Sequence, residues 1–247
     1  MFVSAGFLAA RYGVHDEIAQ FFADREPPAN NLYWHEKLMY LRPEPGYLFI
    51  PVMVDMLHRV GIDRKIILGD DYINLMEAIG HIAAKEEALQ ITHAEAVEGC
   101  ILLVKHNHKN ESYYNAVVDY LRGGNNNFIA SLTTPFKALH RGDIFLFSPC
   151  VLDFNDEQAR KIVEYWFAVI SSFLLLDDAD DLEVDKNTGD ENAFLQSGLD
   201  KDGIERIKQL LTHNLNTLKP INKPLATTID ANFVKMAELP HIKQYLN

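Results

Sequence analysis

The chain has 247 residues, of which 48% are hydrophobic, 11% aromatic and 23% charged, and its formal net charge is −12. These proportions are typical of a globular protein and exclude the disordered and fibrous classes. The negative charge argues against a nucleic-acid partner bound through its phosphates, because such surfaces need clustered Lys and Arg. It is compatible with a cytosolic enzyme or with a site that concentrates cations.

Cysteine usage and hydropathy favour a soluble protein of a reducing compartment, which we expect to be the cytoplasm. The two cysteines, Cys100 and Cys150, lie in apolar surroundings without metal-type spacing, so we predict buried free thiols. The apolar amino terminus, Met1 to Ala10, has no basic leader. The apolar run Ile162–Leu176 is shorter than the roughly 20 residues that cross a bilayer, so we predict a buried helix and no membrane span.

Taken in chain order, the first half of the sequence is patterned for helices. One or two helices are predicted up to Phe22, followed by a break at residues 27–31. Further helices are predicted over Leu32–Leu41; over Tyr47–Val60, with Pro51 starting it late or kinking it; after a cap at Asp70-Asp71; after a Thr92 and Glu95 capping box; and over Tyr113–Leu121, before the stop signal Gly123-Gly124.

The second half continues the helical pattern with two interruptions. The predicted features are a helix capped by Asn127 and ended by Gly142; a short extended connector over Ile144–Val151; a long buried helix from Asn155 or Asp156; a loop over Lys186–Asp190; a helix capped by Asp202 with Glu205; and a short helix over Asp230–Leu239. No hairpin or βαβ pattern is evident. The sequence therefore predicts an all-α, single-domain bundle of nine or ten helices spanning residues 1–247.

A stretch of aspartates follows directly on the long apolar helix. If that helix continues, Asp177, Asp181 and Asp185 fall at i, i+4 and i+8 on one face, and Asp178 lies beside Asp181. Anions are disfavoured at a helix carboxyl end by roughly 0.3 to 1 kcal/mol each. A hard divalent cation such as Mg²⁺ would relieve this, so these four aspartates are the candidate metal ligands.

The aspartates match a known motif. Asp177, Asp178 and Asp181 form an Asp-Asp-x-x-Asp pattern, with Gly189 and further acidic residues behind it. The pattern resembles the second aspartate-rich motif of class I isoprenoid synthases, in particular polyprenyl diphosphate synthases and squalene and phytoene synthase relatives. The resemblance is confined to residues 176–192.

The resemblance implies an isoprenoid-synthase-like helical fold and a possible homodimer. It also implies Mg²⁺ bridging the carboxylates to an isoprenoid diphosphate, with ionisation or transfer of the allylic group inside an apolar cavity. Tyr165, Trp166, Phe167 and Phe173 would be the candidate aromatic walls, although core packing is the commoner role of such residues.

Other parts of the family pattern are incomplete. A first aspartate-rich motif is expected on a facing helix, and its best candidate, Asp70 to Asn74, is also explained as a helix cap. Asn127 and Ser131 fit part of a terpene-cyclase pattern, but Pro135 stands where a Glu is expected. No pattern selects the diphosphate-binding cations, for which the candidates are Lys105, Arg122, Arg141 and Lys186.

Alternative sites are weaker. The runs 185–189 and 200–203 do not fit a calcium loop. Glu77 with His81, and His106 with His108, are spaced to hold a transition metal, yet surface or core histidines are commoner. Two hypotheses therefore stand: a Mg²⁺-dependent relative of isoprenoid synthases, and a non-catalytic helical interaction protein or degenerate synthase with an acidic surface patch. A deep apolar cavity beside the aspartates would favour the first.

Overall fold

The computed structural model of the protein describes residues 4–25, 49–125 and 127–246. Every regular element within these ranges is a helix and none is a strand, which confirms the predicted all-α class. The predicted break at residues 27–31 and the predicted helix Leu32–Leu41 lie outside the described residues.

The helices of the described residues follow one another in chain order. Those of the first half are α1 (Ala5–Tyr12), α2 (Asp16–Asp24), α4 (Phe49–Arg59), α5 (Arg64–Ile67), α6 (Asp70–Glu87), α7 (His93–Val104) and α8 (Glu111–Leu121). Those of the second half are the 3-10 helices η2 (Lys137–His140) and η3 (Asp143–Val151), then α9 (Asp156–Asp180), α10 (Leu182–Thr188), α11 (Ala193–Ser197), α12 (Lys201–Leu218), α13 (Lys223–Ala237) and α14 (Pro240–Leu246).

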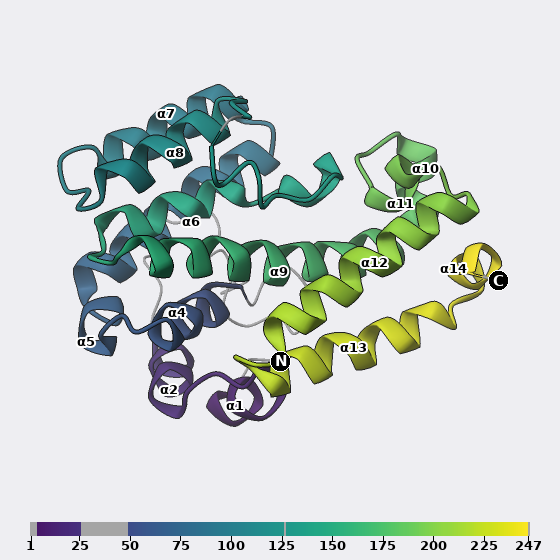
Figure 1. Ribbon diagram of the computed structural model, residues 1–247, viewed down its shortest axis with the longest axis horizontal. Helices are drawn as coiled ribbons and strands as arrows, with labels where there is room; N and C mark the ends of the chain where they lie inside the picture. Colours follow the sequence, from purple (N-terminus) through teal and green to yellow (C-terminus); the bar gives the residue numbers. More distant parts are fainter. Residues whose placement is uncertain (1–3, 26–48, 126, 247) are drawn as a thin grey trace.

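Helix α9 runs through the middle of the molecule (Figure 1). It packs against α4, α12 and α13, while η2, α10 and α11 contact it near its carboxyl end. Helices α6, α7 and α8 pack around η3 as a second group of elements. The buried apolar side chains of the described residues form one cluster that includes both groups.

The long buried helix is confirmed. Asn155 caps α9 by accepting a hydrogen bond from Gln158 N at 2.9 Å, and the Gln158 side chain accepts one from Asn155 N at 3.0 Å. The helix is buried over most of its length. Ser171 and Ser172 bond to carbonyls one turn earlier and accept hydrogen bonds from the buried Asn214, so these polar groups are satisfied inside the core.

We predicted an extended connector over Ile144–Val151, but the segment belongs to the 3-10 helix η3. Gly142 precedes it at φ 87°, a left-handed conformation that favours glycine. Nearly all of η3 is buried between α6, α7 and α8. Its aromatic and β-branched residues therefore reflect burial on all sides. A composition of this kind is also typical of buried strands.

Several helix boundaries differ from the predictions. The Thr92 and Glu95 capping box is confirmed, whereas Gly69, not Asp70-Asp71, occupies the cap of α6. Asn127 accepts a hydrogen bond from Ala130 N but opens only a turn.

The carboxyl-terminal third contains three more corrections. Most of the predicted loop at 186–190 belongs to α10. Asp200 rather than Asp202 caps α12, since its side chain accepts from Gly203 N at 2.7 Å. Helix α13 begins at Lys223, before the predicted Asp230, because Asn222 caps it and Pro224 occupies its first turn. No described helix has both the length and the apolar character needed to span a membrane.

Candidate functional site at the carboxyl end of α9

The aspartate stretch does not lie on one continuous helix. Helix α9 ends at Asp180, and Asp181 stands between it and α10 with φ −90° and ψ 1°. The predicted i, i+4, i+8 face is therefore wrong beyond Asp181, because α10 starts at Leu182. Gly189 then ends α10 in the left-handed conformation, at φ 81°.

Asp178 is buried and has partners for both carboxylate oxygens. Oδ1 accepts a hydrogen bond from the Arg141 guanidinium, and Oδ2 accepts one from Ala193 N at 2.6 Å. The Asn192 side chain donates to the Asp178 carbonyl and to Asp185 Oδ2. Asp178 thus connects α9 to the start of α11 and to Arg141, which follows η2.

Arg141 connects η2 to the aspartates at the carboxyl end of α9. Its Nε donates to the Ala138 carbonyl at 3.0 Å, and its guanidinium lies 3.9 Å from the Asp177 carboxylate. The Arg141 charge lowers the pKa of Asp177, Asp178 and Asp181, but in each case burial raises it by more. One guanidinium therefore does not neutralise the group of aspartates.

Burial and mutual repulsion disfavour the charged forms of these aspartates. Burial, followed by the charges of Asp181, Asp185 and Glu87, raises the pKa of Asp177 to about 6. Burial raises the pKa of Asp178 to about 7. The pKa of Asp181 is also raised, by burial and then by Asp185 and Asp180. Asp177, Asp181 and Asp185 therefore remain electrostatic neighbours despite the break between α9 and α10.

The predicted four-aspartate metal set fits this arrangement poorly. Asp178 would have to give up Arg141 or the Ala193 amide to bind Mg²⁺, which needs ligand oxygens that are open to it. Among the described residues, no three His, Cys, Asp or Glu side chains are grouped closely enough to hold a metal ion. Asp177, Asp181 and Asp185 are the members of the set whose oxygens are more accessible.

The candidate first motif is distant from the second. Asp70 and Asp71 begin α6, whereas Glu87, whose charge reaches Asp177, ends it. At 1.5 Å per residue, the two ends of this 18-residue helix are about 25 Å apart. The structure therefore does not bring the two aspartate pairs together.

The remaining predicted residues lie elsewhere or have structural partners. Arg122 pairs with Glu98, and Lys105 and Lys186 are exposed. Ser131 donates to a backbone carbonyl, and Asn127 bonds to Asp119 and to the backbone.

One member of each histidine-containing pair has a structural partner, and the cysteines are buried. Glu77 is buried against Arg25, and His108 bonds to Glu111 at 2.6 Å and stacks on Tyr114. Cys100 and Cys150 are buried free thiols, as predicted, and burial raises the pKa of both.

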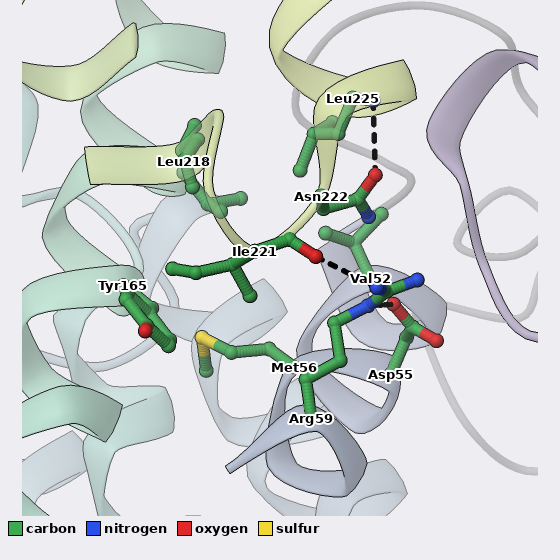
Figure 2. Close-up of a pocket in the computed structure, with 10 residues that line it drawn as sticks. Val52, Asp55, Met56, Arg59, Tyr165, Leu218, Ile221, Asn222 and Leu225 are labelled. Carbon is green, nitrogen blue, oxygen red and sulfur yellow. Dashed lines mark hydrogen bonds and ion pairs between the residues drawn. The ribbon is translucent and has the colours of Figure 1, made fainter. Parts of the chain in front are cut away.

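The candidate aromatic walls are packing residues. Trp166, Phe167 and Phe173 are at most 4% exposed and belong to the core, while Tyr165 is half-buried. Tyr165 lines a cleft of about 10 Å³ between α4 and the α12–α13 turn, which has room for about one water molecule. Figure 2 shows Arg59 in this cleft, bonded to Asp55 and to the Ile221 carbonyl. No predicted site aspartate lines it.

Two features of the site were not predicted from the sequence. The first is the partner of Asp178. The sequence pattern did not single out Arg141 among the four candidate cations, because Arg141 is 37 positions away from Asp178 along the chain. Asn192 carries a usable signal, since an Asn before Ala-Phe-Leu is typical of a helix cap, and it does cap α11. Comparisons of the chain with family models, with curated proteins and with solved structures find no match.

Proposed function

We propose that the chain is a non-catalytic helical interaction protein, and that the carboxyl end of α9 binds a positively charged segment of a partner. The acidic end is defined as residues 177–191, which carry eight carboxylates and one lysine. The single observation that carries the proposal is that Arg141, the cation beside this surface, is already engaged by the buried Asp178.

The exposed members of the acidic end support a protein partner. The side chains of Asp180 and Asp181 have no hydrogen bond or ion pair among the described residues, and both residues are exposed. Burial, and then the like charges of Asp185 and Asp180, raise the pKa of Asp181, so these neighbouring carboxylates repel one another. A segment bearing Lys or Arg would relieve the repulsion and also the unfavourable helix dipole.

The packing of α9 also supports a binding role over catalysis. Its face preceding the aspartates is filled with buried side chains, including Phe173, Leu175 and Leu176. An allylic diphosphate needs an apolar chamber that excludes water from its hydrocarbon tail. The side chains that would line such a chamber instead contact neighbouring helices.

Peptide binding tests the proposal. A fluorescently labelled 12-residue peptide of alternating Lys and Ser is titrated with the protein, and anisotropy gives the dissociation constant. We expect Asp180→Asn/Asp181→Asn to weaken binding about tenfold, since each lost contact removes about 0.5–1 kcal/mol. Added salt should weaken binding to the wild type.

The matched control removes the same charge from the other end of α9. Asp156→Asn/Glu157→Gln alters two exposed residues of its first turn and leaves the Asn155 cap in place. The two ends of this 25-residue helix are about 36 Å apart. Equal weakening by both double variants would mean that net charge alone attracts the peptide, and the proposal would be rejected.

Magnesium-assisted binding of an isoprenoid diphosphate is the second candidate. The observation that favours it is the mutual repulsion of Asp177, Asp181 and Asp185, which a divalent cation would relieve. Calorimetry with Mg²⁺ alone, and then with an isoprenoid diphosphate, tests it. Heat of binding that disappears in Asp181→Asn but not in Asp156→Asn would establish this candidate, and its absence from the wild type would exclude it.

A further inference from the structure

A hollow of about 380 Å³ lies at the connection between α6 and α7. Its lining residues come from the end of α6, the connection and the first turn of α7: Glu86, Leu89, Gln90, Ile91, Thr92, His93 and Glu95. The hollow is large enough for an amino-acid side chain and its flanking backbone.

Leu89, at the edge of the hollow, is unusual in two respects. Its φ of 55° places it in the left-handed region, which is unfavourable for residues that carry a Cβ atom. Its side chain is also 91% exposed, the largest exposed fraction among the large hydrophobic residues that stand out at the described surface. Both features cost free energy in the isolated chain.

Leu199 shows what compensation for this conformation looks like. Its φ is 56°, almost the same as that of Leu89, but its half-buried side chain packs against the hydrophobic core. Packing therefore offsets the backbone strain at Leu199. Leu89 has no such packing, so its strained backbone together with its exposed apolar side chain points to a binding role.

The walls of the hollow are held in place by hydrogen bonds. His93 bonds to Glu86 at 2.6 Å and to the Leu121 carbonyl at 2.9 Å. Thr92 and Glu95 form the capping box that begins α7. The backbone N–H of Leu89 donates to the Glu86 carbonyl at 2.9 Å, which fixes the turn that presents the leucine. A partner would meet a preformed surface.

The hollow has more acidic than basic side chains, which favours a basic partner even though Glu86 is already bonded to His93. Glu86 and Glu95 line it, and His93 is its one basic side chain. Glu87, next along α6, lies close enough to the acidic end to raise the pKa of Asp177. The end of α6 that lines the hollow is therefore within electrostatic reach of the acidic end.

We propose that this hollow receives an apolar side chain of the same basic partner segment, with Leu89 as the contact residue. The inference rests on the proposed function and adds the chemistry of the partner: Lys or Arg residues for the acidic end, together with a large apolar residue for the hollow. An extended segment of 12 residues spans about 40 Å, so one such segment can carry both kinds of residue at separate points along its length.

The test compares two labelled 12-residue peptides, one of alternating Lys and Ser and one in which two central serines are replaced by leucine. We expect the leucine-containing peptide to bind the wild type about tenfold more tightly, consistent with partial burial of one leucine side chain. In Leu89→Asn the ratio of the two affinities should fall close to one. The melting temperature of this variant should not fall, because asparagine tolerates the left-handed conformation.

The matched control is Leu102→Asn, which removes another exposed leucine, 61% exposed on α7, without touching the hollow. It should leave the affinity ratio unchanged. A ratio that survives in Leu89→Asn, or falls equally in Leu102→Asn, would overturn the inference. Leu89-dependent binding to phosphatidylcholine vesicles would overturn it too, since it would identify a lipid surface as the occupant.

The same peptides separate this inference from the proposed function. Asp180→Asn/Asp181→Asn should weaken both peptides by the same factor and leave their ratio unchanged. If the Lys and Ser peptide is unaffected by that variant, the proposed function fails while the ratio still reports on the hollow. If that variant weakens the Lys and Ser peptide as expected but the affinity ratio does not change in Leu89→Asn, the proposal for the hollow is rejected and the proposed function is retained.

Discussion

The body and the carboxyl end of α9 differ although they belong to one helix. The body is buried among neighbouring helices, whereas the end carries a run of carboxylates. The boundary runs between adjacent residues: Asp178 is 1% exposed and bonded to Arg141, while the Asp177 side chain is 40% exposed. Successive residues point about 100° apart on a helix, so neighbours in one motif have different environments. The motif residues therefore divide into a structural aspartate and surface aspartates.

The largest effect is expected where the two parts meet. Arg141→Met should lower the free energy of unfolding by about 3–4 kcal/mol at pH 8, because the buried Asp178 must then stay charged without its cation or take up a proton. Urea denaturation measures this. The double variant Arg141→Met/Asp178→Asn should recover part of the loss, since the uncompensated charge is gone.

Arg160→Met provides the control for Arg141→Met. Arg160 pairs with Glu164 on the surface of α9, so its loss should cost less than about 1 kcal/mol. If the two single variants are equally stable, Asp178 has no structural role and all four aspartates return as candidate ligands.

The second effect concerns the body of α9. Leu175→Ala should lower the free energy of unfolding by about 3 kcal/mol, because Leu175 is fully buried and its truncation leaves a cavity. Thermal and urea denaturation give the value. A loss below about 1 kcal/mol would indicate that this face borders an open chamber, which would favour the enzyme hypothesis.

The third effect is a dependence of stability on pH. Burial raises the pKa of Asp143 to about 7, although Tyr120 and Trp166 donate hydrogen bonds to it. Because the pKa is higher in the folded state than in the unfolded state, the folded protein binds the extra proton between about pH 4 and pH 7. Stability contributed by this group is thus fully present at low pH and is lost as the pH rises through 7.

The variant Asp143→Asn isolates that contribution. Between pH 5 and pH 7 the wild type should lose about 2 kcal/mol more stability than the variant, at 1.4 kcal/mol per pH unit over the titrated range. Urea denaturation at several pH values measures the difference. Parallel pH profiles for the two proteins would contradict a raised pKa at Asp143.

The smallest effect is expected at the exposed end. Asp181→Asn should change the free energy of unfolding by only a few tenths of a kcal/mol, and in the stabilising direction, because it removes a negative charge from a helix carboxyl end and from like-charged neighbours. Salt should reduce the gain. A marked destabilisation would mean that Asp181 has an internal partner, unlike the surface role assigned to it.

Local sequence signals predicted much of this fold but little of the site. The capping box at Thr92, the start of α9 near Asn155 and the apolar periodicity of α9 are encoded within a few residues, and these predictions were confirmed. The 3-10 conformation of η3 was missed because its composition reports burial without a helical period. The aspartate cluster was visible in the sequence, while the pairing of Arg141 with Asp178 was not, because it depends on tertiary packing.

The location of peptide binding tests the central claim most directly. Amide chemical shifts of the ¹⁵N-labelled protein are recorded while the unlabelled Lys and Ser peptide is added. The largest changes should fall on residues 177–191, with smaller ones at the start of α7, and in Asp180→Asn/Asp181→Asn they should need about ten times more peptide to reach the same size. Changes centred on the first turn of α9, or spread evenly over the acidic surface, would contradict the account.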